Sequence, residues 1–258
     1  MSIFREKLEK CARVNDSRVV LALDLSVSTR KKDYREKLLE MVRRVLGDVR
    51  EHIAGVKVNF QLLLPLGLFE GIQMLIEDAA GYGLPVIMDC KLNDVGHTNE
   101  WAARHFFDAG FDALIANPFV GWKDGLERVF SVAKEYKRGI ILLVYMSHPG
   151  AVEGYGQKVI SGRKVRFQYE VFAERAKAWR ADGVVVGATR PEIIRRVSEI
   201  IGGELPIFSP GIGFQGGLIG EAFTAGASYA IVGRSIYQSE NPKESALRIK
   251  TEINRVLG

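Results

Sequence analysis

Residues 86–94 read V-I-M-D-C-K-L-N-D and place three ionisable side chains at the end of an apolar run of β-strand type. Because alternate side chains of a strand share a face, we expect Asp89 and Lys91 to point the same way and Cys90 to point the opposite way. Asp94 follows within one turn of loop. Such groups are costly to desolvate unless they pair or take part in chemistry. This stretch alone leaves two interpretations open, a structural Asp–Lys ion pair or a catalytic network.

The composition indicates an ordinary globular protein with room for a large core. The chain has 258 residues, of which 47% are hydrophobic and 26% charged, and this length fits one large α/β barrel or two small domains. The net charge of +5 is mild and its basic residues are spread along the chain. That charge suits an anionic substrate. Because no nucleic-acid-binding motif occurs, we expect no nucleic-acid partner.

The cysteines and the apolar segments indicate a cytoplasmic protein. Cys11 and Cys90 lie far apart without metal-type spacing, so neither a disulfide framework nor a zinc site is expected. We expect the protein to reside in a reducing compartment. The first seven residues are charged and resemble no signal peptide. The longest apolar run, Ile140–Met146, is too short to cross a bilayer. We therefore expect no membrane partner.

Short β-branched runs alternate with longer amphipathic segments along the whole chain. The expected strands are Val19–Leu25, Gly55–Phe60, Pro85–Lys91, Asp112–Asn117, Gly139–Tyr145, Gly183–Gly187, Pro206–Ser209 and Ser228–Gly233. The expected helices are Lys32–Glu51, Leu68–Gly81, Thr98–Ala109, Trp122–Tyr136, Phe167–Ala181, Pro191–Ile201, Gly220–Gly226 and Pro242–Leu257. Eight such units predict a closed (β/α)8 TIM barrel, a single domain over residues 1–258. An open doubly wound sheet is the alternative.

Polar side chains recur where the expected strands end, which is where a barrel of this kind carries its functional residues. They are Asp24, Lys57 with Asn59 and Gln61 after it, Asp89 with Lys91 and Asp94, Asn117, Ser147 and Arg234. Any one of them could be a loop cap or a solvated charge. Their shared location favours a site.

Two glycine-rich loops late in the chain predict a phosphate site. They read S-P-G-I-G-F-Q-G-G at 209–217 and V-G-R-S-I at 232–236, after the seventh and eighth strands, where barrels commonly bind phosphate through backbone N–H groups. Gln215 and Arg234 can add side-chain donors. The alternative is a set of turn glycines with a surface arginine. The glycines also fit G-x-G-x-x-G, but the seventh unit of a barrel, followed by a strand ending in Gly233, is the wrong context for a nicotinamide cofactor.

The segment after the fifth strand begins M-S-H-P-G at Met146 and stays polar to about Arg166. A loop of this length at the active face of a compact domain is typical of a lid. His148 within it is a candidate general base, although a histidine before proline also suits a turn.

Taken together, these motifs resemble the orotidine 5′-monophosphate decarboxylases, TIM barrels of the pyrimidine pathway. The resemblance covers nearly the whole chain. Its stretches are L23-D24-L25, the Lys57 strand, D89-C-K-L-N-D94 with V95-G-H-T98, M146-S-H-P-G150, S209-P-G-I-G-F-Q-G-G217 and V232-G-R-S-I-Y237. The family usually has Ile where this chain has Val95.

The resemblance implies decarboxylation of orotidine 5′-monophosphate to uridine 5′-monophosphate, with Lys91 stabilising and then protonating a C6 carbanion. It implies a catalytic tetrad of Lys57, Asp89, Lys91 and Asp94. The implied substrate-binding residues are Asp24, Lys57, Thr98, Ser147, Pro210, Gln215, Gly233 and Arg234. It further implies no metal, no cofactor, and a homodimer in which Asp94 and Thr98 reach the partner's site.

Two other readings remain open from the residues. A sugar-phosphate decarboxylase or aldolase shares the D-x-K-x-x-D element and would be expected to hold Mg²⁺ near the third strand. A non-catalytic nucleotide-binding protein on the same scaffold would be expected to lack Lys91 or one of the aspartates, and all are present.

Overall fold

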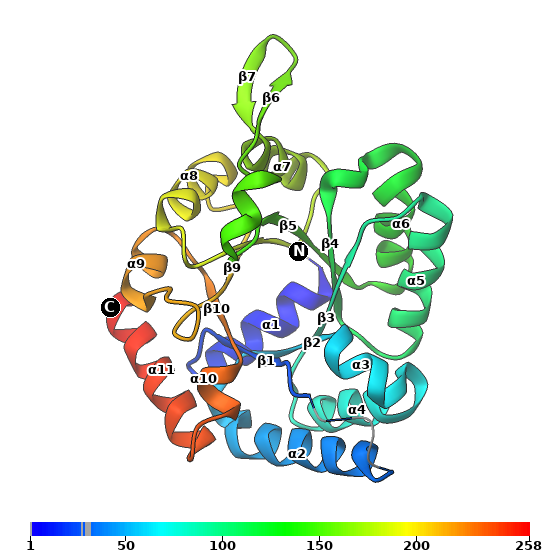
Figure 1. Ribbon diagram of the computed structural model, residues 1–258, viewed down its shortest axis with the longest axis vertical. Coiled ribbons are helices and arrows are strands. Elements are labelled where there is room, and N and C mark those ends of the chain that lie inside the picture. Colours follow the sequence, from blue (N-terminus) through cyan, green and yellow to red (C-terminus); the bar gives the residue numbers. More distant parts are fainter. Residues whose placement is uncertain (1, 27, 29–31) are drawn as a thin grey trace.

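Eight parallel strands close into a barrel, in the order β1-β2-β3-β4-β5-β8-β9-β10, with helices around the outside (Figure 1). This arrangement is seen in a computed structural model that describes residues 2–26, 28 and 32–258. The barrel strands are β1 Val19–Leu23, β2 Gly55–Asn59, β3 Val86–Leu92, β4 Ala113–Ala116, β5 Gly139–Tyr145, β8 Gly183–Val186, β9 Ile207–Pro210 and β10 Tyr229–Val232. The predicted TIM barrel is confirmed, and the open sheet is not formed.

Amphipathic helices cover the outer face of the strands. The α-helices are α1 Ile3–Val14, α2 Tyr34–Val49, α3 Phe60–Leu66, α4 Gln73–Gly81, α5 Gly96–Asp108, α6 Glu127–Tyr136, α7 Gln168–Ala178, α8 Pro191–Ile201, α9 Ile219–Thr224, α10 Arg234–Tyr237 and α11 Pro242–Leu257. Shorter helical segments are η1 Arg50–His52, η2 Gly67–Ile72, η3 Pro118–Val120, η4 Trp122–Leu126 and η5 Pro149–Glu153. The longer helices each bury one apolar stripe, as α8 does with Ile193, Ile194, Val197 and Ile201.

The barrel strands are buried on both faces, which is why they read as continuous apolar runs without polar alternation. Every residue of β1, β4 and β5 is buried. The polar exceptions fall in the middle or at the carboxyl end of their strands, as Lys57 and Asn59 do in β2 and Asp89 and Lys91 in β3. The core therefore leaves one end of the barrel free for chemistry.

The N-terminal helix α1 was not predicted, and it closes the opposite end of the barrel (Figure 1). Phe4 and Leu8 are each 1% exposed. The ring of Phe4 lies against Gly139 at the start of β5, so closely that a Cβ there would come within 2.6 Å of it. Because α1 precedes the first strand, the strand–helix repeat gives no signal for it, although its buried residues do have helical spacing.

The predicted helix Leu68–Gly81 begins earlier and is kinked. Helical structure starts at Phe60, and non-helical backbone angles at Phe69 and Glu70 separate α3 and η2 from α4. Among the described residues, this run over Phe60–Gly81 is the one helical stretch with the length and apolar character to span a membrane. The break at Glu70 and the buried face of α4 make it part of the barrel wall.

Two further predictions were wrong in detail. The segment predicted as a long loop to Arg166 holds η5 and an antiparallel hairpin, β6 Lys158–Ser161 with β7 Lys164–Phe167, which projects outward from the barrel (Figure 1). The helix predicted over Thr98–Ala109 begins two residues earlier, at Gly96, without a side-chain cap. Thr98 therefore lies in its first turn, and Asn99, the next residue, accepts from the N–H of Asp94 and donates to its C=O in the preceding loop.

The packing of α1 predicts that Phe4→Ala destabilises the fold by about 3–5 kcal/mol, the usual cost of truncating a buried phenylalanine. Ile3→Ala is the matched control, since Ile3 is on the same helix and 52% exposed. Urea unfolding measures both variants. A loss in Phe4→Ala no larger than that in Ile3→Ala would contradict the role of α1 as a closure of the core.

Candidate active site

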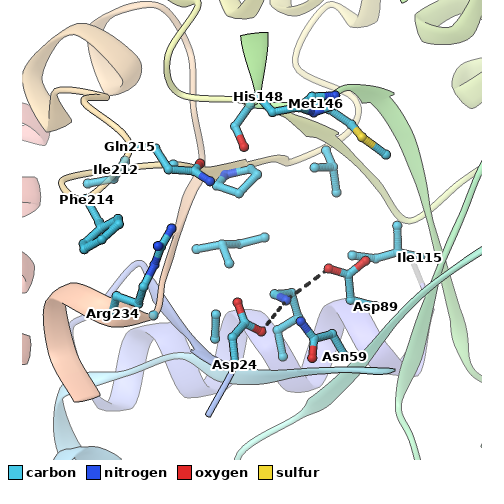
Figure 2. Close-up of a pocket in the computed structure, with 18 of the residues that line it drawn as sticks. Asp24, Asn59, Asp89, Ile115, Met146, His148, Ile212, Phe214, Gln215 and Arg234 are labelled. Atoms are coloured by element: carbon cyan, nitrogen blue, oxygen red, sulfur yellow. Dashed lines mark hydrogen bonds and ion pairs between the residues drawn. The ribbon is translucent and has the colours of Figure 1, made fainter. Parts of the chain in front are cut away.

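A pocket of about 320 Å³ opens at the carboxyl ends of the barrel strands. Its floor is apolar and comes from strands around the barrel, through Ala22, Ile115, Leu143, Val185 and Ile231. Above this floor lie three cationic side chains, Lys57, Lys91 and Arg234, and two carboxylates, Asp24 and Asp89. Figure 2 shows the carboxylates on one side of the pocket and Gln215 with Arg234 on the other. The pocket therefore has two chemically distinct ends.

Lys57 lies at the centre of the charged end. Its Nζ donates to Asp24 Oδ1 at 3.2 Å and to Asp89 Oδ2 at 3.0 Å (dashed lines in Figure 2). The other oxygen of Asp89, Oδ1, accepts from Lys91 Nζ at 2.6 Å. The side chain of Lys57 is 6% exposed and that of Asp89 is 11%, while Lys91 is 38% exposed. Lys91 is thus the member that faces the open pocket.

The network keeps its members charged despite burial. Burial alone would lower the pKa of Lys57, but the carboxylates of Asp89 and Asp24 outweigh it and raise that pKa above its usual value. Burial would raise the pKa of Asp89, and the two lysines outweigh it and lower that pKa. The lowered pKa of Asp89 stabilises the fold above about pH 4, where the carboxyl would be ionised in the unfolded chain as well. The raised pKa of Lys57 stabilises the fold below about pH 10. Stability from these groups is lost outside that window.

Lys91 occupies a distorted position at the end of β3. Its φ of 46° is in the left-handed region, which is sparsely populated by residues other than glycine. The pairing of β3 with β4 shifts register between Met88 and Leu92. Cys90 is buried on the opposite face, as predicted, and burial raises its pKa to about 12. The bulge turns Lys91 onto the oxygen of Asp89 that Lys57 leaves free.

The phosphate-type loops meet at the other end of the pocket. The loop after β9 has positive φ at Gly211, Gly213 and Gly216, a conformation that glycine tolerates best. It folds on itself, with Gly213 N–H donating to Gly217 C=O at 2.9 Å and Gly216 N–H to Gly213 C=O at 2.8 Å. Gly233 and Arg234 begin α10 beside it, and both line the pocket.

Ser147 and Pro210 lie between the two ends, and both line the pocket. The Ser147 carbonyl accepts from Thr189 Oγ1 at 2.9 Å. The backbone of Ser147 packs closely against Gly187, because a Cβ at Gly187 would come within 2.5 Å of Ser147 Cα. Close backbone approach of this kind fixes where the serine side chain can reach.

Asp94 and Thr98 lie apart from the other predicted residues, and neither lines the pocket of its own chain. Both are exposed. Asp94 Oδ1 accepts from the N–H of Val95 at 2.7 Å. Within one described chain the network is therefore Asp24, Lys57, Asp89 and Lys91.

Comparisons with known proteins identify the family of this chain. The model of the "Orotidine 5′-phosphate decarboxylase / HUMPS family" matches residues 17–249. The chain belongs to this family. The orotidine 5′-phosphate decarboxylase of Methanosarcina barkeri is 38% identical over 235 residues, which are 91% of this chain and 94% of that protein. That of Pyrococcus furiosus is 36% identical, over 91% of this chain and 97% of the relative.

Solved structures place the same family on this fold. Orotidine 5′-monophosphate decarboxylase from Methanocaldococcus jannaschii, crystallised with the inhibitor BMP, superposes with a TM-score of 0.75 at 33% identity, covering 92% of this chain and 99% of that one. UMP synthase from Leishmania donovani gives a TM-score of 0.84 at 27% identity, and the match spans 99% of this chain but 56% of that longer one.

Several residues that line the pocket were not among the predicted site residues. They are Met146, Gly211, Ile212, Phe214 and Ser235, with the apolar floor. Asn59 caps α3 through the N–H of Gln61 at 3.0 Å, so its amide has a structural task. His148 lies exposed at the rim and begins η5. Asn59 was predicted by its position at a strand end and His148 as a candidate general base, and both line the pocket, whereas nothing in the sequence predicted the position of Phe214.

The Lys57–Asp89–Lys91 network predicts that Asp89→Asn lowers stability by about 3–5 kcal/mol at pH 7, because it leaves two lysines without their shared carboxylate. As the pH falls through the lowered pKa of Asp89, the wild-type carboxylate protonates, and the difference should shrink. Urea unfolding at pH 7 and at several values below pH 4 measures both effects.

The control is Asp78→Asn, which breaks the exposed pair with Arg43, where both side chains are at least 33% exposed. Such a surface pair contributes about 1 kcal/mol or less. If the two variants lose the same stability at pH 7, the buried network does not stabilise the fold in this way.

Proposed function

We propose that this protein decarboxylates orotidine 5′-monophosphate to uridine 5′-monophosphate in pyrimidine biosynthesis. The observation that carries the proposal is a single pocket that holds a lysine–carboxylate network at one end and glycine loops with an arginine at the other. Membership of the family and the names of its relatives support the substrate. A substrate with a carboxylate on its base and a phosphate on its ribose matches these two ends.

The charges of the pocket suit a substrate with two anionic groups. Three cationic side chains line the pocket against two carboxylates. Lys57 is held between both carboxylates, which leaves Lys91 and Arg234 as the cations that face open space. Lys91 would meet the carboxylate end of the ligand and Arg234 the phosphate.

The chemistry proposed needs a cation where the C6–carboxylate bond breaks. The electron pair of that bond stays on C6 as CO₂ leaves, and Lys91 stabilises the developing carbanion and then donates its proton to C6. Asp89 faces the departing carboxylate, a like-charge contact that is worse in the ground state than in the transition state. Its bond to Lys57 keeps Asp89 ionised for that task. The proposed mechanism uses no metal and no organic cofactor.

The remaining residues bind the parts of the nucleotide that do not react. Asp24 and Lys57 would hold ribose hydroxyls, Ser147 would read the pyrimidine edge with Pro210 beside it, and Gln215, Gly233 and Arg234 would bind phosphate. Phosphate lies away from the reacting carbon, so its binding energy can order the loops that cover the site. We place the enzyme in the cytoplasm, where its two buried free cysteines stay reduced.

The direct test follows the ultraviolet change of orotidine 5′-monophosphate on mixing with the purified protein, with and without EDTA. Turnover unaffected by EDTA supports the proposal. Absence of turnover would contradict the proposed function, and turnover only with added Mg²⁺ would contradict the metal-free mechanism.

Lys91→Ala should lower turnover by many orders of magnitude, because it removes the proton donor and the cation that faces C6. The control is Lys243→Ala, an exposed lysine on α11 outside the pocket. Steady-state rates measure both. If Lys91→Ala keeps more than about a tenth of the wild-type rate, a barrier change of only ~1.4 kcal/mol, Lys91 is not the proton donor.

We also propose a two-fold dimer in which Asp94 and Thr98 complete the partner's site. Large apolar side chains lie exposed near this loop, with Val95 64%, Trp101 51% and Phe69 55% exposed. Phe69 and Trp101 both pack against the His105 ring, so η2 and α5 present one surface. An exposed apolar surface beside unused polar groups is typical of a subunit interface.

Mixing inactive Lys91→Ala subunits with inactive Asp94→Ala subunits tests the shared site. If Asp94 acts across the interface, each hybrid has both lesions at one site and an intact second site, so activity should return to about a quarter of the wild-type value per site after random exchange. Differently tagged subunits show whether exchange occurs. Exchange without any return of activity would contradict the shared site, even if light scattering shows a dimer.

A further inference from the structure

Phe214 is a large aromatic side chain at the tip of the loop after β9, and it is 60% exposed. Burial does not explain its presence there. Its ring lies under the guanidinium of Arg234, with 3.5 Å between Arg234 Cζ and the ring centroid (Figure 2). This is the shortest of the described cation–π contacts. Both residues line the pocket.

Among the residues that the structure describes, the guanidinium of Arg234 forms no ion pair or hydrogen bond, and it stacks on the ring of Phe214. Stacking uses one face of the planar guanidinium and leaves the N–H groups at its edge free to donate. An arginine held this way has its bidentate edge available for an anion. A carboxylate partner would have occupied that same edge.

The ring itself rests on a constrained loop. Gly213 and Gly216 flank Phe214 and Gln215 with φ of 74° and 89°. The loop closes on itself through the N–H of Gly216, which donates to the Gly213 carbonyl at 2.8 Å. Phe214 therefore extends from a short hydrogen-bonded turn, and it connects the loop after β9 to the residue that begins α10.

We infer that Phe214 is a positioning residue for phosphate, acting by stacking on Arg234 and holding its edge toward the pocket. The inference rests on the proposed function, since it assigns the phosphate of the nucleotide to Arg234. A free arginine side chain has many rotamers, and fixing them on binding weakens affinity. The ring reduces that loss before the ligand arrives. Phe214 touches no reacting atom.

The experiment compares Phe214→Leu, which keeps an apolar side chain without a π face, with Phe214→Tyr, which keeps the ring. Dissociation constants for uridine 5′-monophosphate, uridine and inorganic phosphate are measured by calorimetry, and KM and kcat for orotidine 5′-monophosphate by ultraviolet assay. Thermal melting checks that each variant is folded. Because Phe214 is exposed, neither change should unfold the protein.

Phe214→Leu should weaken uridine 5′-monophosphate binding about 3- to 10-fold, the range expected for one cation–π contact at a partly exposed site. Phe214→Tyr should stay within about 2-fold of wild type, because its ring still stacks. Uridine, which lacks phosphate, should bind all three proteins equally. KM should rise in Phe214→Leu by more than kcat falls. In an Arg234→Ala background, Phe214→Leu should have no further effect on nucleotide binding.

Three outcomes would overturn the inference. They are equal nucleotide affinity in Phe214→Leu and wild type, an equal loss for uridine that would make the ring a contact for the base, and a loss that persists undiminished without Arg234. The proposed function is judged separately by wild-type turnover of orotidine 5′-monophosphate. If the wild-type protein binds the nucleotide without turning it over, the proposed function is contradicted. The binding measurements then still test the role of Phe214 in phosphate binding. Absence of both nucleotide and phosphate binding would overturn the two together.

Discussion

The ammonium group of Lys57, buried between two carboxylates, is the interaction on which the active end of this barrel depends. Removing such an ion from water costs several kcal/mol unless well-placed partners replace its hydration. Lys57 is on β2, and its partners come from the strands on either side, with Asp24 directly after β1 and Asp89 in β3. The pairing aligns Ala22 with Lys57 and Asn59 with Asp89. A slip of one residue would turn Lys57 toward the outer helices, so the ion network and the register of three strands support each other.

The orientation of Lys91 depends on the same interaction. Asp89 gives one oxygen to Lys57 and the other to Lys91, and the bulge at the end of β3 turns Lys91 toward that second oxygen. A left-handed φ at a lysine is sparsely populated, and such strain persists where the surroundings over-determine the geometry. The rigid part of the network is therefore the deep part. The exposed member, Lys91, is the one placed to meet a ligand.

Much of this arrangement could be predicted from the sequence, because the barrel repeats one simple pattern. Eight apolar runs alternating with amphipathic segments predicted the fold, and polar residues at strand ends predicted that Asp24, Lys57, Asp89 and Lys91 lie in one pocket. Helix α1 escaped prediction because it stands outside the repeat, and the β6–β7 hairpin did so because its polar residues read as loop. The kink at Phe69 and Glu70 lies between Gly67 and Gly71 and follows Pro65, helix-breaking residues that the prediction of one helix from Leu68 did not use.

The site was less predictable where geometry depends on tertiary contacts. Alternation correctly placed Asp89 and Lys91 together, but the bulge that brings their atoms to 2.6 Å is a consequence of pairing with β4. The proximity of Phe214 to Arg234 joins two loops that are 20 residues apart in sequence and adjacent in the barrel. The glycines of the first loop were predicted for their close approach to an anion. In the structure, the same glycines also form the turn that carries the ring of Phe214. One glycine-rich segment therefore leaves room for an anion near its backbone and places an aromatic ring against Arg234 of the neighbouring loop.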